Sequence, residues 1–279
     1  MSASLQGLTA QVPTALVIFD IDGVVRDVSG SYRRAIADTV EHFTKGRYRP
    51  APEDIDALKA EGCWNNDWEA SRELIEREAT RSGFAGEAIS YTEIIEFFQA
   101  KYRGTNFSGY IQDEPMLMSQ AYLAELTEGG IAWGFFSGAT RASASYILET
   151  RLGLVQPLLV AMEDAPSKPN PAGLFATIEQ LAQRDDFSWN PHQPLGCPIV
   201  YVGDTVADMQ TIRSAQQTYP NQDWIAVGVI PPHVKSRADY AQLLRSAGAR
   251  QVLETVQALS PSLLADDLMS QTDVTDSGS

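Results

Sequence analysis

The chain has 279 residues and a formal net charge of −15 at pH 7. This charge opposes a non-specific grip on nucleic-acid phosphates, which needs clustered Lys and Arg, so nucleic acid is not expected as a partner. Two cysteines and three scattered histidines supply neither a disulfide framework nor the ligand spacing of a zinc site. The first fourteen residues lack the pattern of a signal peptide and no run of about twenty apolar residues occurs, so we expect a cytoplasmic protein with no membrane partner.

The first apolar run, residues 15–19, is followed at once by Asp20, Asp22 and Gly23. An unbroken run of β-formers ended by Asp and Gly predicts a strand buried on both faces, as in a parallel sheet. Open α/β sheets bind their ligands at the carboxyl ends of such strands. Asp20 and Asp22 could therefore reach one bound substrate, one as a nucleophile and the other as an acid and base. A plain turn is the alternative, but it would leave two acids at a buried strand end without a partner for their charge.

Helical patterns fill the long gap before the next apolar run, 131–136. Apolar residues recur at helical spacing in this gap, and a helix is expected over 91–102. Residues 28–110 are therefore predicted to form a small helical domain inserted after the first strand.

Further short apolar runs alternate with helical patterns along the rest of the chain. They cover residues 131–136, 158–162, 199–202 and 224–229. This alternation predicts an α/β fold, a doubly wound parallel sheet with helices on both faces. The core domain would comprise residues 1–27 and 111–265. Residues 266–279 are acidic and rich in Ser and Thr, so a disordered tail is expected there.

Two motifs after later strands could bind an anion. Ser137 and Gly138 follow the second run, where a hydroxyl and free backbone amides at a helix start would form an anion site. A plain helix N-cap at Ser137 is an equally good interpretation of that residue alone. Lys168 lies between Ser167 and Pro169, where a fixed lysine could offer its charge to a phosphate or a carboxylate. An ordinary solvated surface lysine is the alternative.

A second pair of acids follows the run 199–202. Asp204 comes directly after Gly203, and Asp208 would lie one helical turn further along the same face. Together with Asp20 and Asp22 these carboxylates would repel one another unless a divalent cation or a lysine compensated their charge. Hard oxygen ligands with room for water and phosphate indicate Mg²⁺.

The order of these motifs resembles the haloacid dehalogenase superfamily of hydrolases, over about residues 15–259. A helical insertion after the first motif resembles the cap of its subfamily IA. Each motif is weak by itself, but the ordered set at strand ends is specific. The matching residues are Asp20, Asp22, Gly23, Ser137, Gly138, Lys168, Pro169, Gly203, Asp204 and Asp208.

The resemblance implies a role for each residue. Asp20 would attack the substrate phosphorus and form a phosphoaspartyl intermediate, while Asp22 would protonate the leaving oxygen and then activate water. Ser137 and the amide of Gly138 would hold the phosphoryl oxygens, and Lys168 would offset negative charge. Mg²⁺ would be held by Asp20, Asp204 and the main-chain carbonyl of Asp22, with help from Asp208.

The resemblance also places substrate choice in the cap, in the loop that contains Gly62, Trp64 and Asn65. Trp64 could stack on a substrate ring or pack within the cap. Arg26 is a further candidate for contact with an acidic substrate, although surface solvation would explain it as well. The substrate itself is not specified, because chemistry belongs to the core and selectivity to the cap.

The leading hypothesis is a Mg²⁺-dependent phosphatase acting on a small phosphorylated metabolite. A phosphomutase of the same superfamily shares all four motifs and would release an isomerised sugar phosphate instead of free phosphate. Dehalogenase and phosphonatase activities are disfavoured, because those relatives lack an acid at the position of Asp22. A non-catalytic binding or regulatory protein would be expected to have lost a catalytic residue, and none is missing here. Monomer and homodimer both remain open.

Overall fold

The structure is a computed structural model that describes residues 12–61, 63–64, 66–83 and 89–265. The chain packs as two compact units. The first, here called the core unit, comprises Met1–Arg26 with Met116–Ser279, and the second, the cap unit, comprises Asp27–Pro115. The inserted segment thus starts one residue before the expected 28–110 and ends five residues after it. The expected tail, 266–279, lies outside the described residues.

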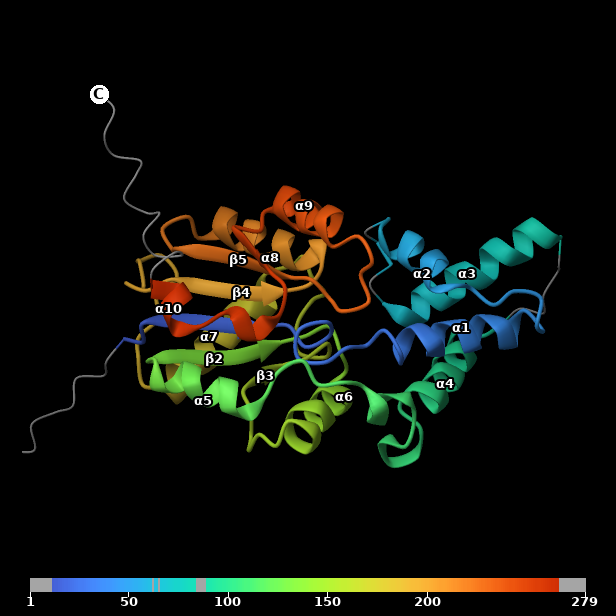
Figure 1. The fold of residues 1–279 in the computed structure, drawn as a ribbon, viewed down its shortest axis with the longest axis horizontal. Coiled ribbons are helices and arrows are strands. Elements are labelled where there is room, and N and C mark those ends of the chain that lie inside the picture. Colours follow the sequence, from blue (N-terminus) through green and yellow to red (C-terminus); the bar gives the residue numbers. More distant parts are fainter. Residues whose placement is uncertain (1–11, 62, 65, 84–88, 266–279) are drawn as a thin grey trace, which may run out of the picture. The chain divides into compact units, whose positions relative to one another are not determined.

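The core unit contains a six-stranded sheet in the order β3-β2-β1-β4-β5-β6, and all its strand pairs are parallel (Figure 1). This confirms the predicted α/β class. The strands are β1 Ala15–Phe19, β2 Ile131–Phe136, β3 Leu159–Val160, β4 Ile199–Gly203, β5 Trp224–Val229 and β6 Gln251–Leu253.

One strand is shorter than the apolar run that predicted it. The run 158–162 gives only the two-residue strand β3, which pairs with Phe135 and Phe136 at the edge of the sheet. The other predicted strands end within one residue of their runs. An edge strand has a neighbour on one side only, so its length depends on how far that neighbour extends and cannot be read from apolarity.

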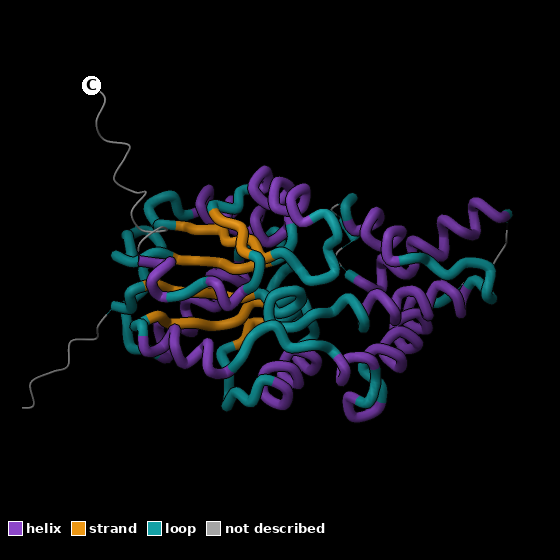
Figure 2. The backbone as a smooth tube through the Cα atoms, viewed as in Figure 1, coloured by secondary structure: helices purple, strands orange, loops and turns teal. Residues whose placement is uncertain are grey.

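Helices cover both faces of the sheet (Figure 2). In the core unit they are α5 Gln120–Glu128, α6 Arg141–Ser145, the π-helical turn Tyr146–Arg151, α7 Ala172–Arg184, α8 Val206–Thr218, α9 Arg237–Ala247, the 3₁₀ turn Val256–Ala258 and α10 Pro261–Leu263.

Side chains of β1 alternate between two apolar layers. Leu16 and Ile18 belong to one buried cluster with Ile178 of α7 and with residues of α8 and α9. Phe19 faces the other layer, where its ring centroid lies 6.3 Å from that of Tyr122 in α5. Because successive strand residues point to opposite faces, a strand buried in both layers must be apolar throughout. All five residues of β1 are buried, which explains the unbroken run in the sequence.

The strand order reverses direction beside β1. The chain passes from β1 to β2 and β3 on one side, then crosses to β4, β5 and β6 on the other. The main-chain N–H of Asp20 donates to the carbonyl of Val202 at 2.8 Å, so the carboxyl ends of β1 and β4 lie side by side. Such a reversal opens a crevice at the carboxyl ends of the strands, and there α/β folds place their ligand sites.

The cap unit, within the residues described, consists of helices and turns. The helices are α1 Tyr32–Phe43, α2 Pro52–Lys59, α3 Asp67–Ser82 and α4 Tyr91–Tyr102, followed by the 3₁₀ turns Thr105–Phe107 and Tyr110–Asp113. The Ser90 side chain caps the N-terminus of α4 in a capping box with Glu93, so the helix begins at Tyr91, where the sequence predicted it. Among the described helices, none has the length and apolarity needed to cross a membrane.

Candidate active site

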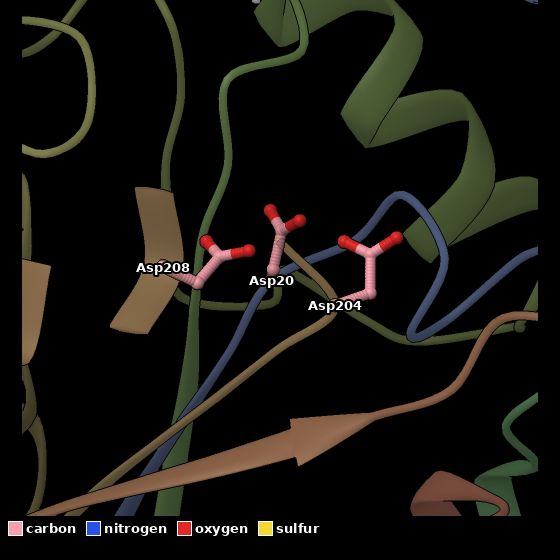
Figure 3. Close-up of side chains that lie close together, drawn as sticks. All are labelled: Asp20, Asp204 and Asp208. Atoms are coloured by element: carbon pink, nitrogen blue, oxygen red, sulfur yellow. The ribbon is translucent and has the colours of Figure 1, made fainter. Parts of the chain in front are cut away.

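Three buried carboxylates converge at the carboxyl end of the sheet. Asp20 follows β1, Asp204 follows β4, and Asp208 lies in the first turn of α8. One carboxylate oxygen from each lies within 4.8 Å of the others. Figure 3 shows Asp20 between Asp208 and Asp204, with the three carboxylates on the same side of the backbone. The structure thus brings together three of the four acids that the sequence motifs single out.

The start of α8 fixes Asp208. Thr205 is the N-cap residue and Asp208 is at the third helical position, and the two form a capping box. The Thr205 N–H and hydroxyl both donate to Oδ2 of Asp208, at 2.9 and 2.7 Å. A Thr followed three residues later by an acid is a readable helix-start signal. The sequence-based prediction did not use this signal, although it would have located Asp208 in the first turn of the helix.

Two glycines let the acids approach the backbone. Gly23 has φ +74°, and a Cβ added there would lie 2.1 Å from Oδ2 of Asp204. A Cβ added at Gly203 would lie 2.3 Å from Cβ of Asp208. No real Cβ tolerates such distances, so both acids depend on the absence of a side chain at these two positions.

Lys168 bridges two of the carboxylates. Its Nζ lies 2.7 Å from Oδ1 of Asp20 and 2.8 Å from Oδ1 of Asp208. The side chain is only 11% exposed, so it is not the solvated surface lysine that was the alternative. A compact ammonium at this position compensates part of the charge of the cluster.

Burial and mutual repulsion shift the pKa values of these groups. Burial raises the pKa of Asp20 to about 7, with Asp208 and Asp22 adding to the rise and Lys168 opposing it. Burial, Asp208 and Asp20 raise the pKa of Asp204 well above its usual value. Burial also opposes ionisation of Asp208, but Lys168 and the Thr205 hydrogen bonds outweigh it and lower its pKa. Lys168 therefore favours ionisation of Asp208, whereas burial and mutual repulsion oppose full ionisation of Asp20 and Asp204.

Two tyrosines that sequence reasoning did not identify complete the surroundings. The buried Tyr201 hydroxyl lies 3.1 Å from Oδ1 of Asp208 and 3.2 Å from the carbonyl of Phe136. The Tyr240 hydroxyl donates to the carbonyl of Asp204 at 2.8 Å. Tyr201 lies within an apolar run, where nothing in the sequence distinguishes it from a core residue.

The Ser137–Gly138 motif lies at the end of β2. The side chain of Ser137 is buried, and its Oγ accepts the N–H of Ala139 at 3.1 Å. The following helix begins at Arg141 and its N-cap is Thr140, so the alternative of a helix cap at Ser137 is wrong. Gly138 is exposed, and a Cβ added there would meet nothing within 4 Å. The space beside its Cα is therefore open.

The other site residues predicted from the sequence, where the structure describes them, lie outside the cluster of three buried carboxylates. Asp22 is 38% exposed, and its carboxylate contacts Arg26, whose side chain is completely buried. Arg26 is thus held within the core unit, whereas a role in contacting an acidic substrate was the sequence-based hypothesis. Trp64 is half-buried in the cap unit, and its indole N–H donates to Glu61 at 2.8 Å. Gly62 and Asn65 lie outside the described residues.

Stabilisation by Mg²⁺ should depend on pH. An unfolded Asp titrates near 3.8, whereas Asp20 in the metal-free fold titrates at about 7. The stability that its protonation contributes is thus complete below the unfolded pKa and is lost as pH rises through about 7. Metal ligation needs the carboxylate form, so the rise in thermal midpoint with saturating Mg²⁺ should be larger at about pH 8 than at about pH 5.5.

Thermal unfolding with Mg²⁺ and with chelator at both pH values measures this difference. Asp204→Asn is the control, since it should reduce the Mg²⁺-dependent rise at both pH values. An equal rise at both pH values in the unaltered protein would contradict the assignment of these acids as the metal ligands.

Comparison with known proteins identifies the family of the chain. A model of the haloacid dehalogenase-like hydrolases matches residues 14–216, so the chain belongs to that family of enzymes. The "Phosphatase Tt82" of Thermococcus thioreducens has a similar structure, with TM-score 0.57 and 22% identity, covering 82% of this chain and 99% of that one. A β-phosphoglucomutase of Clostridium difficile gives TM-score 0.58 at 17% identity, covering 93% and 98%.

A relative with a different name is more similar in sequence. The imidazoleglycerol-phosphate dehydratase of Phytophthora nicotianae is 30% identical over 259 residues, which make up 90% of this chain and 51% of that protein. The chain spans about half the length of this relative.

Proposed function

We propose that this hydrolase is a Mg²⁺-dependent phosphatase that cleaves a small phosphorylated metabolite through a phosphoaspartyl intermediate on Asp20. The observation that carries the proposal is the position of Asp20. Its carboxylate lies 2.7 Å from Lys168 Nζ, beside two further buried acids and at the strand reversal of the sheet. A buried nucleophile next to a fixed cation is the arrangement that phosphoryl transfer needs, because the reaction is accelerated mainly by positioning and electrostatics.

The proposed reaction has two steps, formation and hydrolysis of the phosphoaspartyl group, and each residue of the site has a role in them. Asp20 attacks phosphorus, and Asp22 gives a proton to the leaving oxygen. In the second step Asp22 takes a proton from the water that attacks the phosphoaspartyl group. The Ser137 hydroxyl and the Gly138 amide hold phosphoryl oxygens, and Lys168 orients Asp20 and favours its ionised form.

The donor set fits Mg²⁺. Asp20, Asp204 and Asp208 offer hard oxygen ligands within 4.8 Å of one another, while Lys168 supplies a single positive charge. Asp20, Asp204 and the carbonyl of Asp22 would hold the ion. Asp208 would contribute indirectly, by fixing the position of Lys168 through their ion pair. Bound Mg²⁺ would neutralise charge on the transferring phosphoryl group.

The proposed substrate is a small phosphate monoester, and the Phytophthora relative suggests which compounds to test first. The name of that protein refers to imidazoleglycerol phosphate, so esters that join an imidazole ring to a phosphorylated polyol belong in the panel. We propose that the protein acts as a monomer or homodimer and that neither nucleic acid nor a membrane is its partner.

Phosphate release from a panel of monoesters, with Mg²⁺ and with chelator, tests the proposal. The panel should include sugar phosphates, phosphoglycolate, nucleotides and imidazole-bearing polyol phosphates. We expect Mg²⁺-dependent release of inorganic phosphate with a clear preference for one class. Formation of an isomeric phosphate without release would indicate a phosphomutase, and no turnover of any ester would contradict a phosphatase.

A further inference from the structure

Arg26 has the largest fully buried side chain among the described residues. Its guanidinium contacts Oδ1 of Asp22 twice, from Nε at 2.8 Å and from Nη2 at 2.6 Å. The arginine side chain is 0% exposed, whereas that of Asp22 is 38% exposed. The pair therefore consists of a buried cation that holds a carboxylate at the border with solvent.

The backbone of the same loop fixes this contact. The N–H of Arg26 donates to the carbonyl of Ile21 at 3.2 Å, and the N–H of Gly23 donates to the carbonyl of Arg26 at 2.9 Å. Arg26 also forms an isolated backbone bridge with Met116. The loop closes on itself directly after Asp20, so the spacing of four residues brings the guanidinium to Asp22.

Burying the charge of an arginine at this position is energetically unfavourable unless an acidic or polar group interacts with it. Its neighbours Val24 and Val25 are also fully buried, so this loop is closed to solvent around Arg26. Removing a guanidinium from water is unfavourable and a paired carboxylate offsets only part of that cost, which makes such pairs weak evidence for stability. The planar fork of arginine gives orientation that a point charge lacks.

We propose that Arg26 is a positioning residue for Asp22. By engaging Oδ1, it stops rotation of the half-exposed carboxylate and directs Oδ2, the oxygen that the ion pair does not use, to proton transfer. The inference rests on the proposed function, since it assumes that Asp22 is the acid and base of phosphoryl transfer. A proton donor must lie within hydrogen-bond reach of the leaving oxygen, so a freely rotating Asp22 would protonate that oxygen less efficiently.

Leaving-group dependence tests this role, because a general acid is needed for a poor leaving group and hardly for a good one. We compare Arg26→Met and Arg26→Lys with the unaltered protein on an alkyl phosphate and on 4-nitrophenyl phosphate. The rate measured is release of the leaving group in a single turnover with Mg²⁺, which isolates the first step. Arg26→Met should lower the alkyl phosphate rate by about 10²-fold and the nitrophenyl rate by under about fivefold, with KM little changed.

The other variants show whether the effect is specific to the contact between Arg26 and Asp22. Arg26→Lys keeps the charge without the fork and should recover part of the alkyl phosphate rate. Asp22→Asn should show the same dependence on the leaving group, and adding Arg26→Met to it should have little further effect. Arg237→Lys is the matched control, because Arg237 forms an exposed ion pair with Glu254 in the same unit. It should change neither rate.

The outcomes separate the two claims. A leaving-group-dependent loss in both Asp22→Asn and Arg26→Met supports the inference. An equal loss on both substrates in Arg26→Met, with Asp22→Asn still selective, would show a merely structural arginine and overturn the inference alone. A non-selective Asp22→Asn would overturn the proposed role of Asp22, and the inference with it. Should Arg26→Met fail to fold, Arg26→Lys carries the comparison, with its folding checked by circular dichroism.

Discussion

Replacing Asp20 by Asn should reduce phosphate release by roughly 10³-fold or more, the largest effect of any single substitution in the site. An amide cannot form the phosphoaspartyl bond, and it gives a weaker ligand for Mg²⁺. The fold should survive, because Lys168 keeps its contact with Asp208 at 2.8 Å. Removing one of three buried carboxylates also relieves repulsion within the cluster.

Phosphate release with Mg²⁺, measured on the preferred ester, tests this expectation alongside the thermal midpoint. Asp185→Asn is the matched control, since Asp185 pairs with Arg184 on the surface of the core unit and lies outside the cluster. It should leave turnover unchanged. Turnover by folded Asp20→Asn at more than about a tenth of the normal rate would contradict a nucleophilic role for Asp20.

Gly23→Ala should lower Mg²⁺ affinity and turnover by about 10- to 100-fold, the range seen when groups that orient metal ligands are disturbed. The new methyl group would lie 2.1 Å from Oδ2 of Asp204, so the carboxylate must move away. The φ of +74° adds a backbone penalty of about 1 kcal/mol for alanine. The substitution therefore acts on both the site and the stability of the fold.

Gly46→Ala separates these two contributions. Gly46 has a similar φ of +76°, but a Cβ there would meet nothing within 4 Å. Both variants should lose a comparable amount of stability from backbone strain, and only Gly23→Ala should need more Mg²⁺ for half-maximal turnover. If Mg²⁺ titrations of the two variants coincide, the close approach of Gly23 to Asp204 has no role in metal binding.

The positions of Asp20 and Asp204 could be predicted because strand ends are readable in the sequence. Each acid follows an apolar run directly, and parallel strands bring their carboxyl ends to one edge of the sheet. The predicted carboxyl ends of β1 and β4 therefore sufficed to place these two side chains together. Gly203 could be interpreted in the same way, as a point where the backbone approaches closely.

Contacts between side chains on distant segments were not readable. Lys168 reaches Asp20 and Asp208 only through the path of the loop between β3 and α7, and an apolar pattern contains no information about that path. Tyr201 has the periodicity of a core residue and also binds Asp208. For Arg26, composition favours solvent, since arginines are seldom buried unless paired, and only the loop geometry shows the contact with Asp22.

The measurement that tests the central claim most directly is chemical trapping of the phosphoaspartyl group on Asp20. The protein is mixed with its preferred ester and Mg²⁺, quenched in acid and reduced with borohydride, which converts an acyl phosphate into an alcohol. Peptide mass spectrometry should then find homoserine at position 20, with Asp22 unaltered and with no such product when chelator replaces Mg²⁺. Rapid phosphate release with no reduced residue at position 20, or with reduction at Asp22 instead, would contradict the account.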